Sequence, residues 1–117
     1  MAAHNELGQW GEQVAADYLQ AKGYTVVVRN WKSGHRDIDI VALDGETLVI
    51  VEVKTRRNRL FADPESAVDS RKISSLRQAA NHYVKLYHAD QPVRFDIVTV
   101  TGVVGSMPQI EHIEDAF

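Results

Sequence analysis

Three residues in the middle of the chain have side chains suited to phosphoryl-transfer chemistry: Asp39, Glu52 and Lys54. Successive side chains of a strand point to opposite faces, so Glu52 and Lys54 should share one face of their apolar run. Asp37 and Asp39 should share one face of the preceding run in the same way. Charged side chains are costly to bury without partners, so this pattern in two apolar segments indicates a functional site.

The two apolar runs, 37–43 and 47–55, are separated by Asp44-Gly45. This dipeptide between apolar runs predicts a β-hairpin with a two-residue type I′ turn, because both residues tolerate a positive φ. In the register that such a turn sets, Asp39 and Glu52 become diagonal neighbours on one face. Their Cβ atoms would then lie roughly 5–8 Å apart.

Two carboxylates at that separation repel each other unless a cation lies between them. Mg²⁺ binds one or two carboxylates at about 2.0–2.1 Å and keeps several of its waters. The bound ion lowers the pKa of one water and neutralises charge on a phosphate. Asp39 and Glu52 are therefore predicted to bind Mg²⁺ (or Mn²⁺), and Lys54 to orient or deprotonate the attacking water or to stabilise the developing charge.

The segment after Lys54 is strongly basic, although the chain as a whole has a net charge of −3. Arg56, Arg57 and Arg59 are predicted to contact phosphates beside the site, and Lys72 on a later helix to extend this contact. A local basic patch on an acidic chain favours a confined anionic substrate over general coating of DNA. A solvated loop, with a surface ion-pair ladder on the two strands, is the alternative interpretation.

Apolar residues at helical spacing predict helices over 5–22 and 70–87. Asn5 is the expected N-cap of the first helix, and Gly23 is expected to end it. Residues 30–36 are predicted to form a loop. The predicted strands are 24–29, 37–43, 47–55, 93–101 and, more weakly, 108–113. The order helix, three strands, helix, one or two strands predicts an α/β fold, with a small mixed sheet flanked by helices.

The length of 117 residues predicts a single domain, 1–117, with one modest core. The absence of cysteine excludes disulfides, thiolate metal sites and cysteine nucleophiles. The N-terminus does not have the pattern of a signal peptide, and no apolar run is long enough to cross a bilayer. We therefore expect a cytoplasmic protein with no membrane partner.

Asp39 followed by Glu52-Val53-Lys54 resembles the PD-(D/E)XK signature of nucleases, and the spacing is similar to that of archaeal Holliday-junction resolvases. The chain resembles the YraN family of small bacterial proteins more closely, over about residues 8–101. The matching segments are Gly8–Ala15, Asp37–Ala42, Val51–Arg56, Ala79-Ala80 and Arg94-Phe95-Asp96.

The resemblance implies a restriction-endonuclease-like domain. It also implies that Asp39 and Glu52 bind the metal, that Lys54 is the catalytic lysine, and that Glu12 on the first helix is a further acidic member of the metal and catalytic site. The chain has Arg36-Asp37 where the family pattern is Gly-Glu, which leaves a role for Asp37 in doubt. The proline of the nuclease signature is absent as well.

These observations predict a metal-dependent, structure-selective DNA endonuclease that hydrolyses phosphodiesters in the manner of a Holliday-junction resolvase. Its partner would be DNA, including branched DNA, and a homodimer is expected by analogy with resolvases. Two alternatives stay open. One is a nucleic-acid-binding module that keeps the nuclease fold with little or no catalytic activity. The other is a structural or protein-interaction domain, which would bind no divalent metal.

Overall fold

A computed structural model describes residues 2–58 and 69–117 of the chain, with side chains from residue 6 onward. The elements are α1 (Ala2–Ala21), β1 (Thr25–Ser33), β2 (Arg36–Asp44), β3 (Thr47–Arg56), α2 (Ser70–Leu86), β4 (Val93–Thr101) and β5 (Gln109–Ile113). The predicted α/β class and the order helix, three strands, helix, two strands are confirmed.

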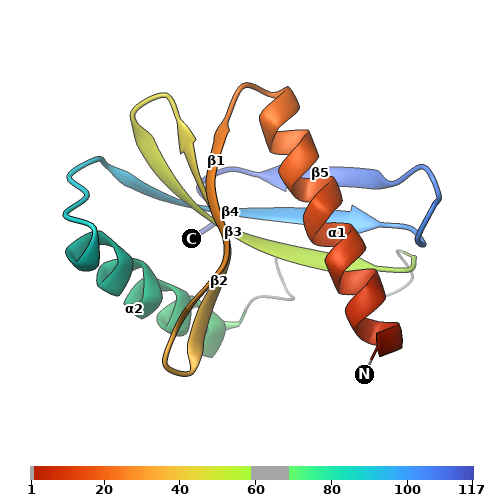
Figure 1. Ribbon diagram of the computed structural model, residues 1–117, viewed down its shortest axis with the longest axis horizontal. Helices are drawn as coiled ribbons and strands as arrows, with labels where there is room; N and C mark the ends of the chain where they lie inside the picture. The colour runs from red at the N-terminus through yellow and green to blue at the C-terminus, as the bar shows by residue number, and fades with distance from the viewer. Residues whose placement is uncertain (1, 59–68) are drawn as a thin grey trace.

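The five strands form one sheet in the order β1-β2-β3-β4-β5. Neighbouring strands are antiparallel except β3 and β4, which are parallel and are connected through α2. The two helices lie on opposite faces of this sheet (Figure 1). The mixed sheet therefore has its single parallel pair at its centre, where β3 carries Glu52 and Lys54.

Strand β3 contributes to two hydrophobic cores, one under each helix. Val49 and Val51 pack with α1, whereas Leu48 and Ile50 pack with α2. A strand that is covered on both faces has a nearly continuous apolar sequence, which explains the run from Leu48 to Val51. The polar residues that follow in β3 mark the point where this double covering ends.

The boundaries of α1 differ from the prediction at one end. The helix begins at Ala2, so Asn5 lies inside it and its prediction as the N-cap is wrong. Alanine has the highest helix propensity, so the helix extends through the alanines that precede the cap signal. Gly23 does end the helix: its φ is 97°, and the Tyr24 N–H donates to the Leu19 carbonyl at 3.0 Å. This is a Schellman-type end.

The predicted loop over residues 30–36 is wrong except at its centre. β1 runs to Ser33 and β2 starts at Arg36, so only Gly34 and His35 form the turn between them. Trp31 pairs with Ile38 across this hairpin and packs against the core under α2. Burial of the indole extends the strand through residues whose local preference is for a loop.

The β2–β3 hairpin forms, but its register differs from the prediction. Asp44 pairs with Thr47, so Gly45 and Glu46 form the two-residue turn, and only Gly45 has a positive φ. The predicted type I′ turn at Asp44-Gly45 is therefore wrong. The last observed pair is Ile40–Val51, so the register places Asp39 and Glu52 next to each other just beyond the end of this ladder.

Candidate active site

The ladder between β2 and β3 ends at the pair Ile40–Val51, so Asp39, the residue that precedes Ile40 in β2, lies just outside it. The Asp39 carboxylate accepts the backbone N–H of Val53 at 2.8 Å in place of a main-chain carbonyl. The flanking isoleucines lie in different cores, since Ile38 packs with α2 and Ile40 with α1. The two-residue alternation of β2 therefore breaks at Asp39, and this irregularity turns the carboxylate toward β3.

The carboxyl groups of Asp39 and Glu52 are hydrogen-bonded to each other. The Glu52 side chain is only 5% exposed. Burial, followed by the negative charge of Asp39, raises the pKa of Glu52 to about 7. Burial also raises the pKa of Asp39, and its bond from the Val53 N–H opposes that effect. The pair therefore retains a proton close to neutral pH, as expected for two acids that share one small, poorly solvated space.

Two lysine ammonium groups lie on the same oxygen of Glu52. Lys54 Nζ is 3.7 Å from Glu52 Oε2, and Lys72 Nζ is 3.6 Å from it. Lys72 belongs to the first turn of α2, where its backbone N–H donates to the N-cap residue Asp69 at 3.0 Å. The cap thus fixes the turn that carries Lys72 over β3. The sequence predicted a phosphate contact for Lys72, and the structure brings its ammonium to the carboxylate pair.

Glu12 approaches the pair from α1, on the other face of the sheet. A Cβ atom at Gly11 would lie 1.9 Å from the Thr55 hydroxyl oxygen, so a side chain at this position would prevent α1 from approaching β3 so closely. Burial, followed by the negative charge of Asp39, raises the pKa of Glu12, whose side chain is hydrogen-bonded to Asn30. The structure thus brings Glu12 within electrostatic range of Asp39.

The described acidic side chains do not form a metal site with three or more protein ligands. Within residues 2–58 and 69–117 no three His, Asp or Glu side chains are grouped closely enough to hold one ion. Asp39 and Glu52 are the pair that the structure does bring together. Two carboxylates with waters completing the shell form a donor set that fits Mg²⁺ or Mn²⁺, which take hard oxygen ligands.

Sequence reasoning missed Thr99, which is the residue of β4 that pairs with Lys54. Paired residues of neighbouring strands share a face and lie about 4.8 Å apart, so Thr99 stands beside Lys54. It is 1% exposed, and its hydroxyl has no hydrogen-bond partner among the described residues. An unpartnered buried hydroxyl indicates a place for an ordered water or a ligand. A threonine among the valines and isoleucines of β4 was the available signal.

The predicted phosphate-binding arginines are not equally placed for that role. Arg56 is half-buried; its Nε donates to Thr101 Oγ1 at 3.2 Å and its Nη2 lies 4.0 Å from Glu111. Arg57 is exposed. Arg59 lies outside the described residues. Of the two arginines that the structure describes, Arg57 is thus more accessible than Arg56.

Residues 11–100 match the family described as "Uncharacterised protein family UPF0102". The chain belongs to this family. The UPF0102 protein of Bacteroides thetaiotaomicron is 55% identical over 117 residues, which cover 100% of this chain and 96% of that protein. The Porphyromonas gingivalis protein is 47% identical over 118 residues (100% and 87%). The Christiangramia forsetii protein is 42% identical over 117 residues (100% and 98%). The predicted YraN-like membership is confirmed. Among the residues described, no helix has both the length and the apolarity to span a membrane.

Proposed function

We propose that this UPF0102 protein is a Mg²⁺- or Mn²⁺-dependent endonuclease that hydrolyses phosphodiesters in DNA. The observation that carries the proposal is the hydrogen-bonded Asp39–Glu52 pair, with the Lys54 ammonium 3.7 Å from Glu52. A buried acid with a strongly raised pKa beside another acid and a lysine is characteristic of catalytic sites. The resemblance to the PD-(D/E)XK signature supports the same assignment.

Each residue has a distinct role in this proposal. Asp39 and Glu52 would hold the cation, and the cation would supply charge neutralisation at the phosphate. Lys54 orients the attacking water and stabilises negative charge that develops on the phosphate oxygens. The free hydroxyl of Thr99 holds a water beside Lys54. Glu12, near Asp39, keeps the local charge negative and so favours a divalent cation.

The substrate in this proposal is DNA with a branched structure. Exposed Arg57, with Arg56 and Arg59 next to it in the sequence, would meet phosphates that flank the cleaved bond. Symmetric junctions need two matched cuts, so a homodimer is the assembly that suits this substrate.

The decisive experiment compares purified wild-type protein with the Asp39→Asn variant on linear, nicked, flap and four-way-junction DNA. Each substrate is incubated with EDTA, with Mg²⁺ and with Mn²⁺. We expect metal-dependent cleavage of branched DNA by the wild type and none by the variant. If neither metal supports cleavage of any of these substrates, the nuclease proposal is wrong.

The second candidate is a nucleic-acid-binding module without catalysis, and the two ammonium groups on Glu52 favour it. Lys54 and Lys72 partly neutralise Glu52 without any metal. A site neutralised in this way could be retained for binding alone. Calorimetric titration with Mn²⁺ separates the candidates. The nuclease should give a heat of metal binding that disappears in the Asp39→Asn variant. The binding module requires no such heat.

A further inference from the structure

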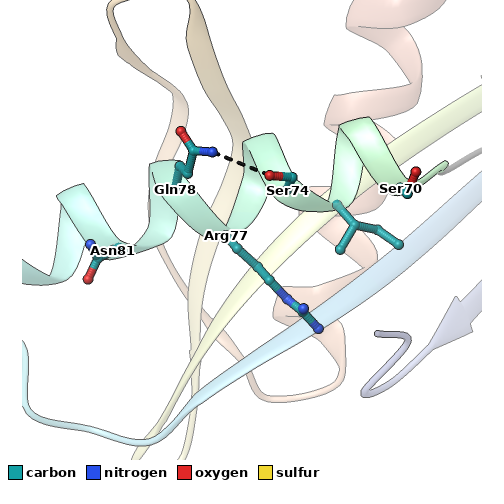
Figure 2. Close-up of a pocket in the computed structure, with 6 residues that line it drawn as sticks. Ser70, Ser74, Arg77, Gln78 and Asn81 are labelled. Atoms are coloured by element: carbon teal, nitrogen blue, oxygen red, sulfur yellow. Dashed lines mark hydrogen bonds between the residues drawn. The ribbon is translucent and has the colours of Figure 1, made fainter.

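The solvent-facing side of α2 carries three hollows that adjoin one another. The central hollow, of about 440 Å³, shares Ser74 and Gln78 with one neighbour and Arg77 and Asn81 with the other. Figure 2 shows these side chains along α2, with Gln78 donating to Ser74 at 3.3 Å. Because they share lining residues, the three hollows adjoin one another; together they are called the α2 trough, which extends from the β1–β2 turn to β4.

One end of the α2 trough is cationic. A hollow of about 320 Å³ is lined there by Arg36 and Arg71 together with His35. Among the residues that the structure describes, no carboxylate lines any of the three hollows, and α2 itself contains neither Asp nor Glu. Although the chain has a net charge of −3, positive charge is concentrated at this surface. Guanidinium groups in such a setting suit phosphate oxygens, which they can bind with two parallel N–H donors.

The other end of the α2 trough is apolar with a polar rim. Val84, Val93 and Phe95 line a second hollow of about 320 Å³, at whose edge stand Arg77 and Asn81. Arg77 leaves the helix in the direction of β4 (Figure 2). Apolar side chains and a guanidinium plane are surfaces on which a nucleobase stacks, and an amide can both donate to and accept from its edge. Only an unpaired base exposes a face for such contact.

We propose that the α2 trough binds an unpaired strand of nucleic acid, with phosphates at Arg36 and Arg71 and a base against Phe95. This proposal rests on the proposed function, and it names the part of the substrate that is held outside the carboxylate site. Arg71 and Lys72 are consecutive residues in the first turn of α2. A nucleic-acid strand in the trough therefore passes the first helical turn of α2, which also carries Lys72 to Glu52.

The test measures binding without cleavage, using the Asp39→Asn protein in EDTA and fluorescence anisotropy. Three probes of equal length carry the same label: an oligothymidylate, an abasic strand with the same phosphates, and a duplex. We expect the thymidylate to bind at least tenfold more tightly than the other two. If the abasic strand binds as tightly as the thymidylate, the base makes no contact. If the duplex binds more tightly than the thymidylate, the ligand is not an unpaired strand. Either result overturns the proposal.

A matched pair of variants assigns the binding to this surface. Arg77→Gln and Lys85→Gln each remove one exposed cation from α2, but only Arg77 lines the trough. We expect Arg77→Gln to weaken thymidylate binding about fivefold, because a surface on which the base stacks is lost, and to lower its salt dependence by less than the roughly 0.7 log units expected for one lost phosphate contact on a single strand. Lys85→Gln should leave both unchanged. Equal behaviour of the two variants overturns the assignment.

The two proposals fail in distinguishable ways. If the wild type cleaves DNA while the three probes bind alike in EDTA, the trough assignment is wrong and the nuclease proposal stands. If the probes and variants behave as expected while no metal supports cleavage, the trough assignment stands and the protein binds without cutting.

Discussion

Two buried carboxyl groups on neighbouring strands, Glu52 of β3 and Asp96 of β4, are held in opposite ways. Asp96 pairs with Val51, which packs under α1, whereas Glu52 contacts Lys72 of α2. The two acids therefore lie on opposite faces of the sheet. The pKa of Glu52 is raised to about 7, and that of Asp96 is lowered below its ordinary value.

Asp96 is fully satisfied by short hydrogen bonds. Arg94 donates to both of its oxygens, each at 2.9 Å, and the Asp115 backbone N–H donates at 3.1 Å. His112 Nε2 lies 2.7 Å from Oδ2, while its Nδ1 faces the Lys22 ammonium, so Nδ1 accepts and Nε2 donates. Burial alone would raise the pKa of Asp96, but these hydrogen bonds outweigh it. Asp96 is therefore a structural acid that partners an arginine.

Glu52 has weaker compensation for a similar degree of burial. Its charged partners are the two ammonium groups at 3.6–3.7 Å, and its neighbour Asp39 is another acid. A fold that satisfies Asp96 so completely leaves Glu52, on the adjacent strand, with ammonium groups no closer than 3.6 Å and with a second acid beside it. Such a local departure from polar satisfaction is expected where a site binds something from outside the fold.

The largest expected effect is on chemistry at the Glu52 site. Lys54→Ala should lower the rate of DNA cleavage at saturating substrate by about a thousandfold, because the ammonium acts on the reacting groups. The affinity for DNA should change by little more than the effect of removing one positive charge. The matched control is Lys85→Ala, which removes a lysine from the surface of α2. If Lys54→Ala cleaves DNA at the wild-type rate, this lysine has no role in the reaction.

Asp96→Asn should be the most destabilising change at the satisfied site. It leaves the Arg94 guanidinium, whose side chain is 18% exposed, without its bidentate partner. The free energy of unfolding should fall by about 3–5 kcal/mol, as when one member of a buried ion pair is removed. Urea denaturation measures this, with exposed Asp17→Asn as the control. A loss of less than about 1 kcal/mol would mean that the Asp96 network contributes little to stability.

The two acids should respond oppositely to pH. The folded pKa of Glu52 lies above its ordinary value of 4.5, so the folded state binds more protons than the unfolded state between pH 4.5 and about 7. The free energy of unfolding contributed by Glu52 should therefore fall as pH rises through this window and level off above it. Glu52→Gln should remove that fall, measured by urea denaturation at several pH values.

Asp96 provides the internal contrast for that measurement. Its folded pKa is lowered, so its stabilisation is present above its ordinary pKa of 3.8 and is lost as pH falls through the folded value. A wild-type stability that does not decline between pH 4.5 and 7 relative to Glu52→Gln would contradict the raised pKa of Glu52.

Lys72→Met should tighten the binding of Mn²⁺ by about tenfold, because it removes a cation that lies 3.6 Å from a proposed ligand oxygen. Isothermal titration calorimetry on metal-free protein measures this affinity. Lys85→Met, on the same helix, should bind Mn²⁺ like the wild type. Weaker binding by Lys72→Met would show that this lysine supports the metal instead of competing with it.

The smallest expected effect is that of Asp39→Asn on the metal-free protein. The asparagine oxygen can still accept the Val53 N–H, and the repulsion from Glu52 is removed. The free energy of unfolding should change by less than about 1 kcal/mol or increase slightly. Thermal and urea denaturation in EDTA measure the change. A loss of several kcal/mol would place Asp39 with Asp96, as an acid on which folding depends.

The sequence by itself determined the elements and the shared face of the key residues in β3. Alternation within one strand is a local property of the backbone, so the placing of Glu52 beside Lys54 could be predicted and agrees with their 3.7 Å contact. The same is true of the end of α1, where Gly23 supplies a conformation that other residues rarely adopt.

The register of the hairpin and the full composition of the site were decided by tertiary structure. Asp44-Gly45 and Gly45-Glu46 are competing turns within the same few residues, and the observed pairing of Asp44 with Thr47 selects the second. Lys72 reaches Glu52 through the crossover of α2, and Thr99 reaches Lys54 through the parallel pairing of β3 with β4. Contacts between residues so distant in the chain depend on how the helix and strands pack together, and no local sequence preference encodes them.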